Sequence, residues 1–504
     1  MKLNLLFLVL VLLFSQGFKQ AIANDPLTTC NLLKEDIPVR AGGRVKPVYV
    51  LAKESIKFLT GKSKFNDESP LLTFCKMSFP EIYPEIANLP ILVEHIDSKK
   101  LLSLSEDEHS ISAKKSLELK ELVRSEIFKQ KENNSYKKDL NKLYSRIDTY
   151  EKISTKESLN FYSQTTKDWH FLSEYQNNED FDFLTYLTNS KDTFIADEGD
   201  KYLLELTYVK SHIYSYTLLL VIIAIFATVL LKNIKIGYGL SVAIILIEIL
   251  GITMRVLISE RAPITNMYET VMFSGFGALI ISLIIYLFRK EKIFILAGLG
   301  YNMLCLFMMM FANNMLSSSI SPLVPVLRDN FWLSTHVSTI ILSYAALALS
   351  WLVANITLIK MRFGKLTKKD YRYHQDLAYT CIKVGIVLLA AGIILGGVWA
   401  DYSWGRFWGW DPKETWSLIV LLFYMAILHA KYTNWLTTHA FILLTAAGFM
   451  TVMMAWFGVN YILASGLHSY GFSEGGAIFL GTFFLVQTSF IILNIKQKYE
   501  VKND

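Results

Sequence analysis

The sequence contains only four cysteines among its 504 residues, and it has no Cys-x-x-Cys or Cys-x-x-Cys-His motif. The second absence excludes a c-type cytochrome, since Cys-x-x-Cys-His is the haem-attachment motif of that class. Cys30 and Cys75 fall in a polar region, where they could form a disulfide or remain two separate buried thiols. Cys305 and Cys381 lie in apolar runs, where packing explains them. Residues 24–210 also lack a nucleotide motif, a metal motif and an internal repeat.

Charged residues are scarce after residue 210, where long apolar runs recur. Hydrophobic residues make up 52% of the chain, aromatic residues 13%, and the mean hydropathy is +0.33. This contrast predicts a polar N-terminal domain followed by a polytopic membrane domain. The net charge of +6 does not indicate nucleic-acid binding, because much of the positive charge lies in short loops between the apolar runs.

The first 23 residues are typical of a segment that directs export. Lys2 is followed by an apolar stretch from Leu5 to Phe14, and Ala21-Ile22-Ala23 fits a small-residue cleavage site. Residues 1–23 are therefore either a signal peptide or a retained membrane anchor. In both cases residues 24–210 are predicted to be an exported domain, mainly helical because apolar residues recur at helical spacing in 101–159.

The chain after residue 210 is predicted to be all-α, since backbone groups in lipid must be satisfied within each span. About nine apolar stretches have a length suited to crossing a bilayer. They run near 211–231, 238–258, 268–288, 293–311, 332–358, 380–398, 416–430, 438–456 and 475–494. Residues 211–495 thus form a membrane domain, and 496–504 form a short tail.

Positive charge alternates between the two sides of these spans. The fifteen Lys and Arg residues of one side lie in 232–237, 289–292, 359–379, 431–437 and the tail after 495. The opposite loops hold only Arg261, Arg328, Arg406 and Lys413. The positive-inside rule places the richer side in the cytoplasm, which agrees with export of residues 24–210.

Five of the ten tryptophans fall between residues 399 and 416, on the predicted outer side: Trp399, Trp404, Trp408, Trp410 and Trp416. An interfacial aromatic belt accounts for one or two of them. Five, interleaved with Gly405 and Gly409 and followed by Asp411-Pro412, better fit a flat apolar surface for a large planar ligand.

Two histidines share the predicted side of this tryptophan-rich segment. His336 opens a span there, and His468 lies in an outer loop. Imidazole is a common axial ligand of haem iron, so the pair predicts a bis-histidine haem site, with two unrelated interface histidines as the alternative. The histidines outside the spans are expected to be solvated: His95, His109, His170, His212 and His374.

Other ionisable residues lie within the predicted spans. His429 follows Trp416 by 13 residues, about 20 Å along a helix, and is a functional candidate near the inner face. His439 could be its neighbour or a plain interface histidine. Glu248 and Arg255 share a face of one span and are expected to pair with each other or with another helix, in a structural role.

Trp404 to Trp416 closely resembles the tryptophan-rich signature of the haem-handling protein superfamily. Within it, the chain resembles the CcsA family, whose members are membrane subunits of the system II cytochrome c synthase. Three segments carry the narrower resemblance, which covers residues 220–495: Arg261-Ala262-Pro263-Ile264-Thr265-Asn266-Met267-Tyr268-Glu269, the surroundings of His336, and Gly466-Leu467-His468-Ser469-Tyr470-Gly471. Upstream, Gly43-Arg44-Val45-Lys46-Pro47 resembles a segment of some fused synthases.

The resemblance implies a protein of the bacterial inner membrane that brings haem b to the outer face. There the haem is held for attachment to the Cys-x-x-Cys-His motif of an apocytochrome c, which makes the chain part of a holocytochrome c synthase (haem lyase). By position, His336 and His468 match the outer haem-iron ligands, and His429 matches an inner one. Trp404, Trp408, Trp410 and Asp411 match the haem-binding loop. No general base is assigned.

The sequence departs from the family pattern at the inner site. In the family a histidine of the CcsB (ResB-like) subunit completes that site, and no such half is found here, which predicts a separate CcsB-like partner. The competing functional hypothesis is a haem transporter or chaperone that attaches nothing. The segments around 261–269 and 466–471 favour the synthase. A membrane b-type electron carrier fits less well, because it needs paired histidines within the spans.

Overall fold

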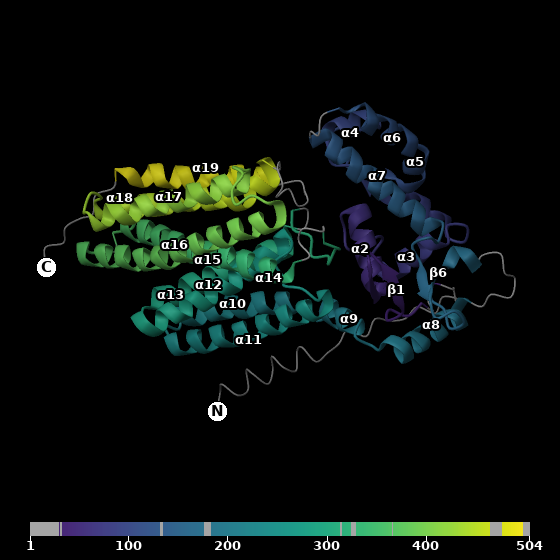
Figure 1. Ribbon diagram of the computed structural model, residues 1–504, viewed down its shortest axis with the longest axis horizontal. Helices are drawn as coiled ribbons and strands as arrows, with labels where there is room; N and C mark the ends of the chain where they lie inside the picture. Colours follow the sequence, from purple (N-terminus) through teal and green to yellow (C-terminus); the bar gives the residue numbers. More distant parts are fainter. Residues whose placement is uncertain are drawn as a thin grey trace. The chain divides into compact units, whose positions relative to one another are not determined.

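The structure is a computed structural model that describes residues 30, 33–131, 135–175, 183–312, 315–323, 329–364, 366–463 and 476–496 (Figure 1). The chain folds into two compact units. One comprises the residues before 40 together with Leu51–Asp197, and the other comprises Arg40–Val50 and the chain from Glu198 onward. The predicted signal segment 1–23 lies outside the described residues.

The first unit is mainly helical, as predicted. Its helices are α2 (Val48–Thr60), α3 (Pro70–Ser78), η2 (Pro84–Asn88), α4 (Ile96–Leu101), α5 (Ala113–Glu118), α6 (Lys120–Lys129), α7 (Ser135–Ser154), η3 (Leu172–Tyr175) and α8 (Phe183–Glu198). Two antiparallel strand pairs were not foreseen: β3 (Pro90–Leu92) with β4 (Ser110–Ser112), and β5 (Asn160–Tyr162) with β6 (Trp169–Phe171). Strands of three residues are too short to leave an alternating pattern in the sequence.

Two links fasten distant parts of this unit. Cys30 and Cys75 form a disulfide with their Cα atoms 5.5 Å apart. Arg146 on α7 is buried and donates to the carbonyl oxygens of Phe58 and Leu92, both at 2.9 Å. It also pairs with Glu94 at 2.8 Å. Because a buried guanidinium needs acceptors, these contacts tie α7 to α2 and β3.

The second unit is an all-α bundle, and the prediction of a polytopic membrane protein is confirmed. In the described chain, nine helical stretches are long and apolar enough to span a bilayer. Their elements are α9 (Leu203–Lys210) with α10 (Ile213–Val229), α11 (Ile234–Ser259), α12 (Met267–Arg289), α13 (Lys292–Phe311), α14 (Asn330–Trp332) with η5 (Leu333–Val337) and α15 (Ser338–Arg362), α16 (Lys368–Trp404), α17 (Pro412–Tyr432), α18 (Thr438–Met453) with η6 (Met454–Leu463), and α19 (Gly476–Ile495). They run side by side in Figure 1.

Helix α15 is the centre of the bundle. Every residue from Ser343 to Ser350 is buried, so this stretch of helix is covered on all sides. By contrast, only 17% of the apolar windows of α17 and α19 is buried inside the protein. These two helices therefore keep large apolar surfaces for lipid or for another protein. Since His336 lies in η5 at the start of the α15 span, a helix with a well-buried middle positions it.

Helix α16 is much longer than the predicted span 380–398. A capping box between Thr367 and Asp370 starts it, and Gly405, with φ of 68°, ends it. The prediction that His374 is a solvated loop residue is therefore wrong. His374 is buried on α16, 2.9 Å from the Thr357 hydroxyl.

The buried ion pair of the bundle joins two helices. Glu248 and Arg255 do not pair with each other. Arg255 on α11 pairs with Glu269 on α12 at 2.7 Å, with both side chains almost fully buried. Glu248 instead accepts a hydrogen bond from Asn302 on α13 at 2.8 Å. The predicted structural role of both residues agrees with these interhelical contacts.

Candidate haem site

The connection between α16 and α17 is built around one carboxylate. Glu414 accepts hydrogen bonds from the backbone N–H groups of Gly409 at 2.7 Å and Asp411 at 3.2 Å. It also pairs with Arg406 at 3.2 Å. Asp411 caps α17 by accepting from the N–H groups of Lys413 and Glu414. The local sequence explains this geometry, since an acidic N-cap followed three residues later by Glu is a capping box.

Two residues of this connection have unusual local geometry. Trp410 adopts φ of 57°, a left-handed conformation that is uncommon outside glycine. A Cβ atom at Gly409 would lie 1.6 Å from Nη1 of Arg406. Only 405–411 is non-helical, because Trp399 and Trp404 belong to α16 and Trp416 belongs to α17. The predicted tryptophan-rich loop is thus two helix ends joined by seven residues.

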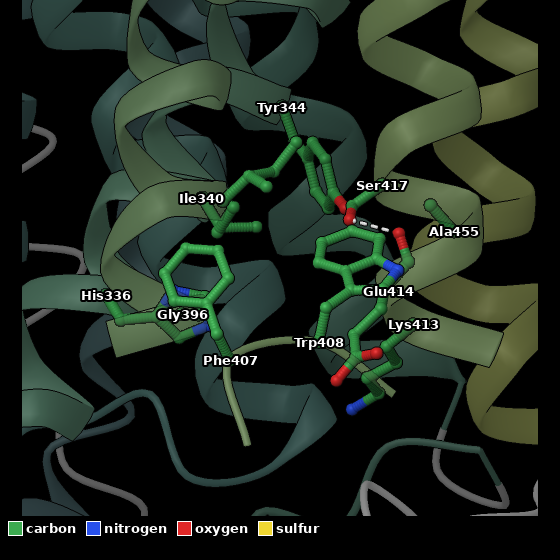
Figure 2. Close-up of a pocket in the computed structure, with 12 residues that line it drawn as sticks. His336, Ile340, Tyr344, Gly396, Phe407, Trp408, Lys413, Glu414, Ser417 and Ala455 are labelled. Carbon is green, nitrogen blue, oxygen red and sulfur yellow. Dashed lines mark hydrogen bonds between the residues drawn. The ribbon is translucent and has the colours of Figure 1, made fainter. Parts of the chain in front are cut away.

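A pocket opens beside this connection (Figure 2). It is lined by His336, Ile340, Tyr344, Ile393, Gly396, Gly397, Phe407, Trp408, Lys413, Glu414, Ser417 and Ala455. Its cavity volume is about 110 Å³, and the pocket is partly open. Ligand pockets combine apolar walls with a few polar groups and commonly measure roughly 300–1,000 Å³. This pocket has that mixed lining and a smaller volume, so it would enclose only part of a large organic ligand.

His336 is oriented by a backbone carbonyl. Its Nδ1 lies 2.8 Å from the carbonyl oxygen of Gly392 on α16. A carbonyl can only accept a hydrogen bond, so Nδ1 must carry the hydrogen. In the neutral imidazole the lone pair is then on Nε2, which is the arrangement that protein ligands of metals use.

Two adjacent glycines of α16 receive aromatic rings of the pocket. A Cβ atom at Gly396 would lie 2.5 Å from Cε1 of His336, and one at Gly397 would lie 2.5 Å from Cζ of Phe407. Figure 2 shows the Phe407 ring beside His336 and Gly396. The two rings can approach α16 this closely because neither glycine has a side chain.

Tryptophans surround the pocket at different depths. Trp399 is buried, and its ring centre lies 5.8 Å from that of His336. Trp408 lines the pocket and meets Trp410 edge to face at 5.8 Å, whereas Trp410 is 69% exposed. The indole Nε1 atoms of Trp399 and Trp408 are buried with no hydrogen-bond partner among the described residues. A buried donor of this kind is costly unless water or a ligand satisfies it.

Only some of the predicted haem-binding residues lie together at the pocket. His336 and Trp408 line the pocket, while Trp404 and Trp410 flank the same connection and Asp411 caps α17. His468 lies outside the described residues. His429 is on α17, twelve residues beyond the pocket residue Ser417, which is about 18 Å along the helix. It is exposed, and its Nδ1 lies 2.8 Å from the carbonyl oxygen of Met425.

His439 does not lie free beside His429. Its Nδ1 is 2.9 Å from the hydroxyl of Tyr371, and its Nε2 is 3.0 Å from the carbonyl oxygen of Asn494. Both nitrogens are therefore engaged in holding α16, α18 and α19 together. This agrees with the plainer of the two interpretations of His439, a structural one.

Several pocket residues were missed at the level of sequence. Gly396, Gly397, Tyr344 and Ser417 line the pocket, yet none was singled out. The Gly-Gly pair three residues before Trp399 was a usable signal, because adjacent glycines in an apolar helix often mark a close approach. Tyr344 left no such signal, since an aromatic residue within a membrane span looks like any packing residue.

Comparison with known proteins identifies the class of membrane protein to which the chain belongs. The sequence model of the cytochrome c assembly protein family matches residues 264–468. That range includes the bundle centre, the α16–α17 connection and the pocket. The chain is thus a multi-pass membrane protein with a role in cytochrome c maturation.

Individual relatives narrow the class. The cytochrome c biogenesis protein CcsA of Guillardia theta is 35% identical over 285 residues, which are 51% of this chain and 93% of that protein. CcsA of Gloeobacter violaceus is 31% identical, covering 48% of this chain and 88% of that protein. Protein NrfI of Wolinella succinogenes is 36% identical over 44% of this chain and 24% of its own length. The chain belongs to the CcsA family of cytochrome c biogenesis proteins.

Proposed function

We propose that this chain is the membrane subunit of a cytochrome c synthase, which brings haem b to the outer face and presents it for attachment to apocytochrome c. The observation that carries the proposal is His336, which lines an aromatic pocket and whose Nδ1 is oriented by the carbonyl oxygen of Gly392. Imidazole nitrogen is a common axial ligand of haem iron.

The pocket fits haem on several counts. Its aromatic lining, Phe407 and Trp408, suits the face of a porphyrin. The buried N–H of Trp408 lacks a partner among the described residues, so a ligand with an acceptor group would satisfy it. Lys413 also lines the pocket and carries the charge that a propionate carboxylate requires. His336 and His468 would together hold the haem iron in this proposal.

Attachment of haem to the apocytochrome does not require a side chain of this chain to react. Each apocytochrome thiol adds across one haem vinyl group: sulfur forms a bond to one carbon, the thiol hydrogen goes to the other, and nothing is oxidised or reduced. The contribution of the protein is to hold the macrocycle so that the thiols meet it at close range. A ligand histidine locked between Gly392 and Gly396 serves that purpose.

The orientation follows from charge. Positive residues gather at the two turns that follow α10 and α12 and in the adjoining helix ends: Lys232, Lys235, Arg289, Lys290 and Lys292. These turns are at the end of the bundle away from the α16–α17 connection, so the positive-inside rule puts the pocket outside the inner membrane. In this proposal residues 24–210 are exported and 211–495 form the haem-handling domain.

The inner end of the proposed path requires a second protein. His429 is exposed on α17, one of the two helices with the least buried apolar surface. A separate CcsB-like subunit packed against α17 would supply the second ligand to haem at His429.

A reporter assay tests this function. The full chain is co-expressed with a CcsB-like partner and an exported Cys-x-x-Cys-His protein, and covalent haem is measured on the denatured reporter. A reporter with Ser-x-x-Ser-His is the control. We expect covalent haem on the cysteine reporter alone. A complex that retains haem and never labels the reporter would instead identify a haem transporter or chaperone.

A further inference from the structure

Residues 315–323 form a strap without helix or strand between α13 and the segment that carries His336. Three of its side chains, Met315, Leu316 and Ile320, are buried. Its last described residue, Leu323, packs against the cluster of Ile264, Leu333 and Trp399. The strap therefore runs through the protein close to the outer pocket, although no backbone ladder holds it in place.

Side chains from four separate elements hold the strap by its carbonyl oxygens. Arg255 on α11 donates to Ser318 at 3.0 Å, and Tyr461 on η6 donates to Met315 at 2.7 Å. Arg261, between α11 and α12, donates to Ser321 at 2.5 Å. Arg44 on β2 donates to Ile320 through Nε at 3.4 Å. The strap has neither helix nor strand, so these contacts take the place of the backbone hydrogen bonds of regular structure, although Ser318 and Ser321 are themselves exposed residues.

Two of the three arginines are fixed in turn by carboxylates. Arg255 pairs with Glu269, and the other oxygen of Glu269 accepts from the backbone and hydroxyl of Thr265, both at 2.7 Å. Arg44 forms a two-pronged pair with Glu205 on α9, through Nη1 to Oε2 and Nη2 to Oε1. A guanidinium held at both prongs has little freedom left, so its remaining N–H keeps a defined direction.

Arg44 differs from the other donors in where it comes from. It follows the two-residue turn Gly42-Gly43 between β1 (Pro38–Ala41) and β2 (Arg44–Pro47), and both glycines adopt positive φ, 62° and 78°. Residues 40–50 belong to the same compact unit as the membrane bundle, although they lie about 150 residues before it in sequence. This short segment thus reaches the bundle and contacts the strap there.

We propose that Arg44 is a positioning residue of the outer haem site, which holds the strap and thereby sets the start of the segment that presents His336. The proposal rests on the proposed function of that site. Arg44 needs to be arginine, because its three donor groups serve two partners at once, a carboxylate and a carbonyl. A lysine has one nitrogen and cannot reproduce a planar fork with a third donor beside it.

Hydrogen exchange in the full-length protein tests the first half of the proposal without haem. The variants are Arg44→Ala, Arg44→Lys and Glu205→Gln, and Arg40→Ala is the matched control, since Arg40 is exposed in the same hairpin. We expect exchange of peptides covering 315–323 to rise about tenfold or more in the three variants, because each variant loosens or removes the charged hydrogen-bond donor that holds the strap. Strap exchange equal to that of the Arg40 variant would overturn the proposal.

Spectroscopy of bound haem tests the second half. We expect the Arg44 variants to retain haem with an altered ligand-field spectrum and a shifted midpoint potential, and Arg40→Ala to match the wild type. A loosened strap with an unchanged spectrum and potential would overturn the positioning role while leaving the haem site intact. If His336→Ala leaves the spectrum and midpoint potential of the bound haem unchanged, the proposed function is refuted. The strap result is unaffected by that outcome.

Discussion

Gly396 offers a sharp perturbation of the proposed haem ligand, because a single methyl group there collides with the His336 ring. The added Cβ of Gly396→Ala would lie 2.5 Å from Cε1, 2.9 Å from Nδ1 and 3.2 Å from Nε2. Carbon atoms rest at about 3.5–4.0 Å, so the ring must move by about 1 Å. A shift of that size disrupts the 2.8 Å hydrogen bond from Nδ1 to the Gly392 carbonyl.

We expect Gly396→Ala to lower the affinity for haem more than it lowers the stability of the fold. Overpacking costs about 1–3 kcal/mol, but alanine regains roughly 0.5–1 kcal/mol of helix propensity over glycine. Outer-shell partners that orient a metal ligand are worth about 10–100-fold in metal affinity. We therefore expect Gly396→Ala to fold in the membrane and to bind haem about 10–100-fold more weakly, as measured by absorbance titration of the apoprotein.

Gly300→Ala is the matched control. Gly300 also lies within a membrane helix, α13, and nothing stands within 4 Å of the position of its Cβ. We expect this variant to bind haem as the wild type does and to be equally stable or slightly more so. Equal haem affinity in the two variants would refute the reasoning that the close approach of His336 to α16 sets the ligand geometry.

Three further predictions concern stability and the loop. Glu414→Gln keeps one oxygen for the two backbone N–H groups but removes the negative charge and sets an NH₂ donor against Arg406, so hydrogen exchange of 405–411 should speed up about tenfold. Cys75→Ser should destabilise the first unit by about 2–5 kcal/mol in proteolysis assays. Burial raises the pKa of Glu94, but Arg146 and Lys142 outweigh it and leave the pKa lowered. Its folded pKa is thus below the unfolded one, so its stabilisation is present above about pH 4.3 and is lost as pH falls through the folded pKa. In Glu94→Gln the loss of stability at acid pH should be smaller, and the free energy of unfolding at neutral pH should fall by about 1.5–3 kcal/mol. A variant as sensitive to acid as the wild type would contradict the pairing of Glu94 with Arg146 and Lys142.

The bundle itself was predictable because bilayer physics imposes a strong pattern. Each span needs about 20 apolar residues, and the stretches predicted from the sequence correspond to the nine apolar helices of the described chain. Span ends were less predictable. Helix α16 runs from Lys368 to Trp404 because a polar helix extends an apolar one, and hydropathy does not register a polar turn.

Contacts between distant residues were beyond the reach of sequence patterns. His336 was identified as a ligand candidate, yet its orientation depends on Gly392 and Gly396, more than fifty positions away. Arg255 was expected to pair with Glu248 or with another helix, and only the structure identifies Glu269 on α12 as its partner. In both cases the helix packing angle decides which groups meet, and a single sequence carries no record of that angle.

The segment from Gly43 to Pro47 was recognisable in the sequence, but its contacts were not. It could be noticed as a motif from its resemblance to a segment of some fused synthases. Its position could not be predicted, because Arg44 meets Glu205 across 161 residues and Ile320 across 276. Side-chain contacts to an irregular strap leave no periodicity, unlike the faces of helices.

The central claim is that His336 binds haem iron in the pocket beside the α16–α17 connection. The most direct measurement is the electron paramagnetic resonance and absorbance spectrum of haem in the purified full-length chain, with His336→Ala and, as the control, His439→Gln. The account predicts a low-spin bis-histidine spectrum in wild type and control, its loss in His336→Ala, and its recovery when imidazole is added to that variant. An unchanged low-spin spectrum in His336→Ala would contradict the account.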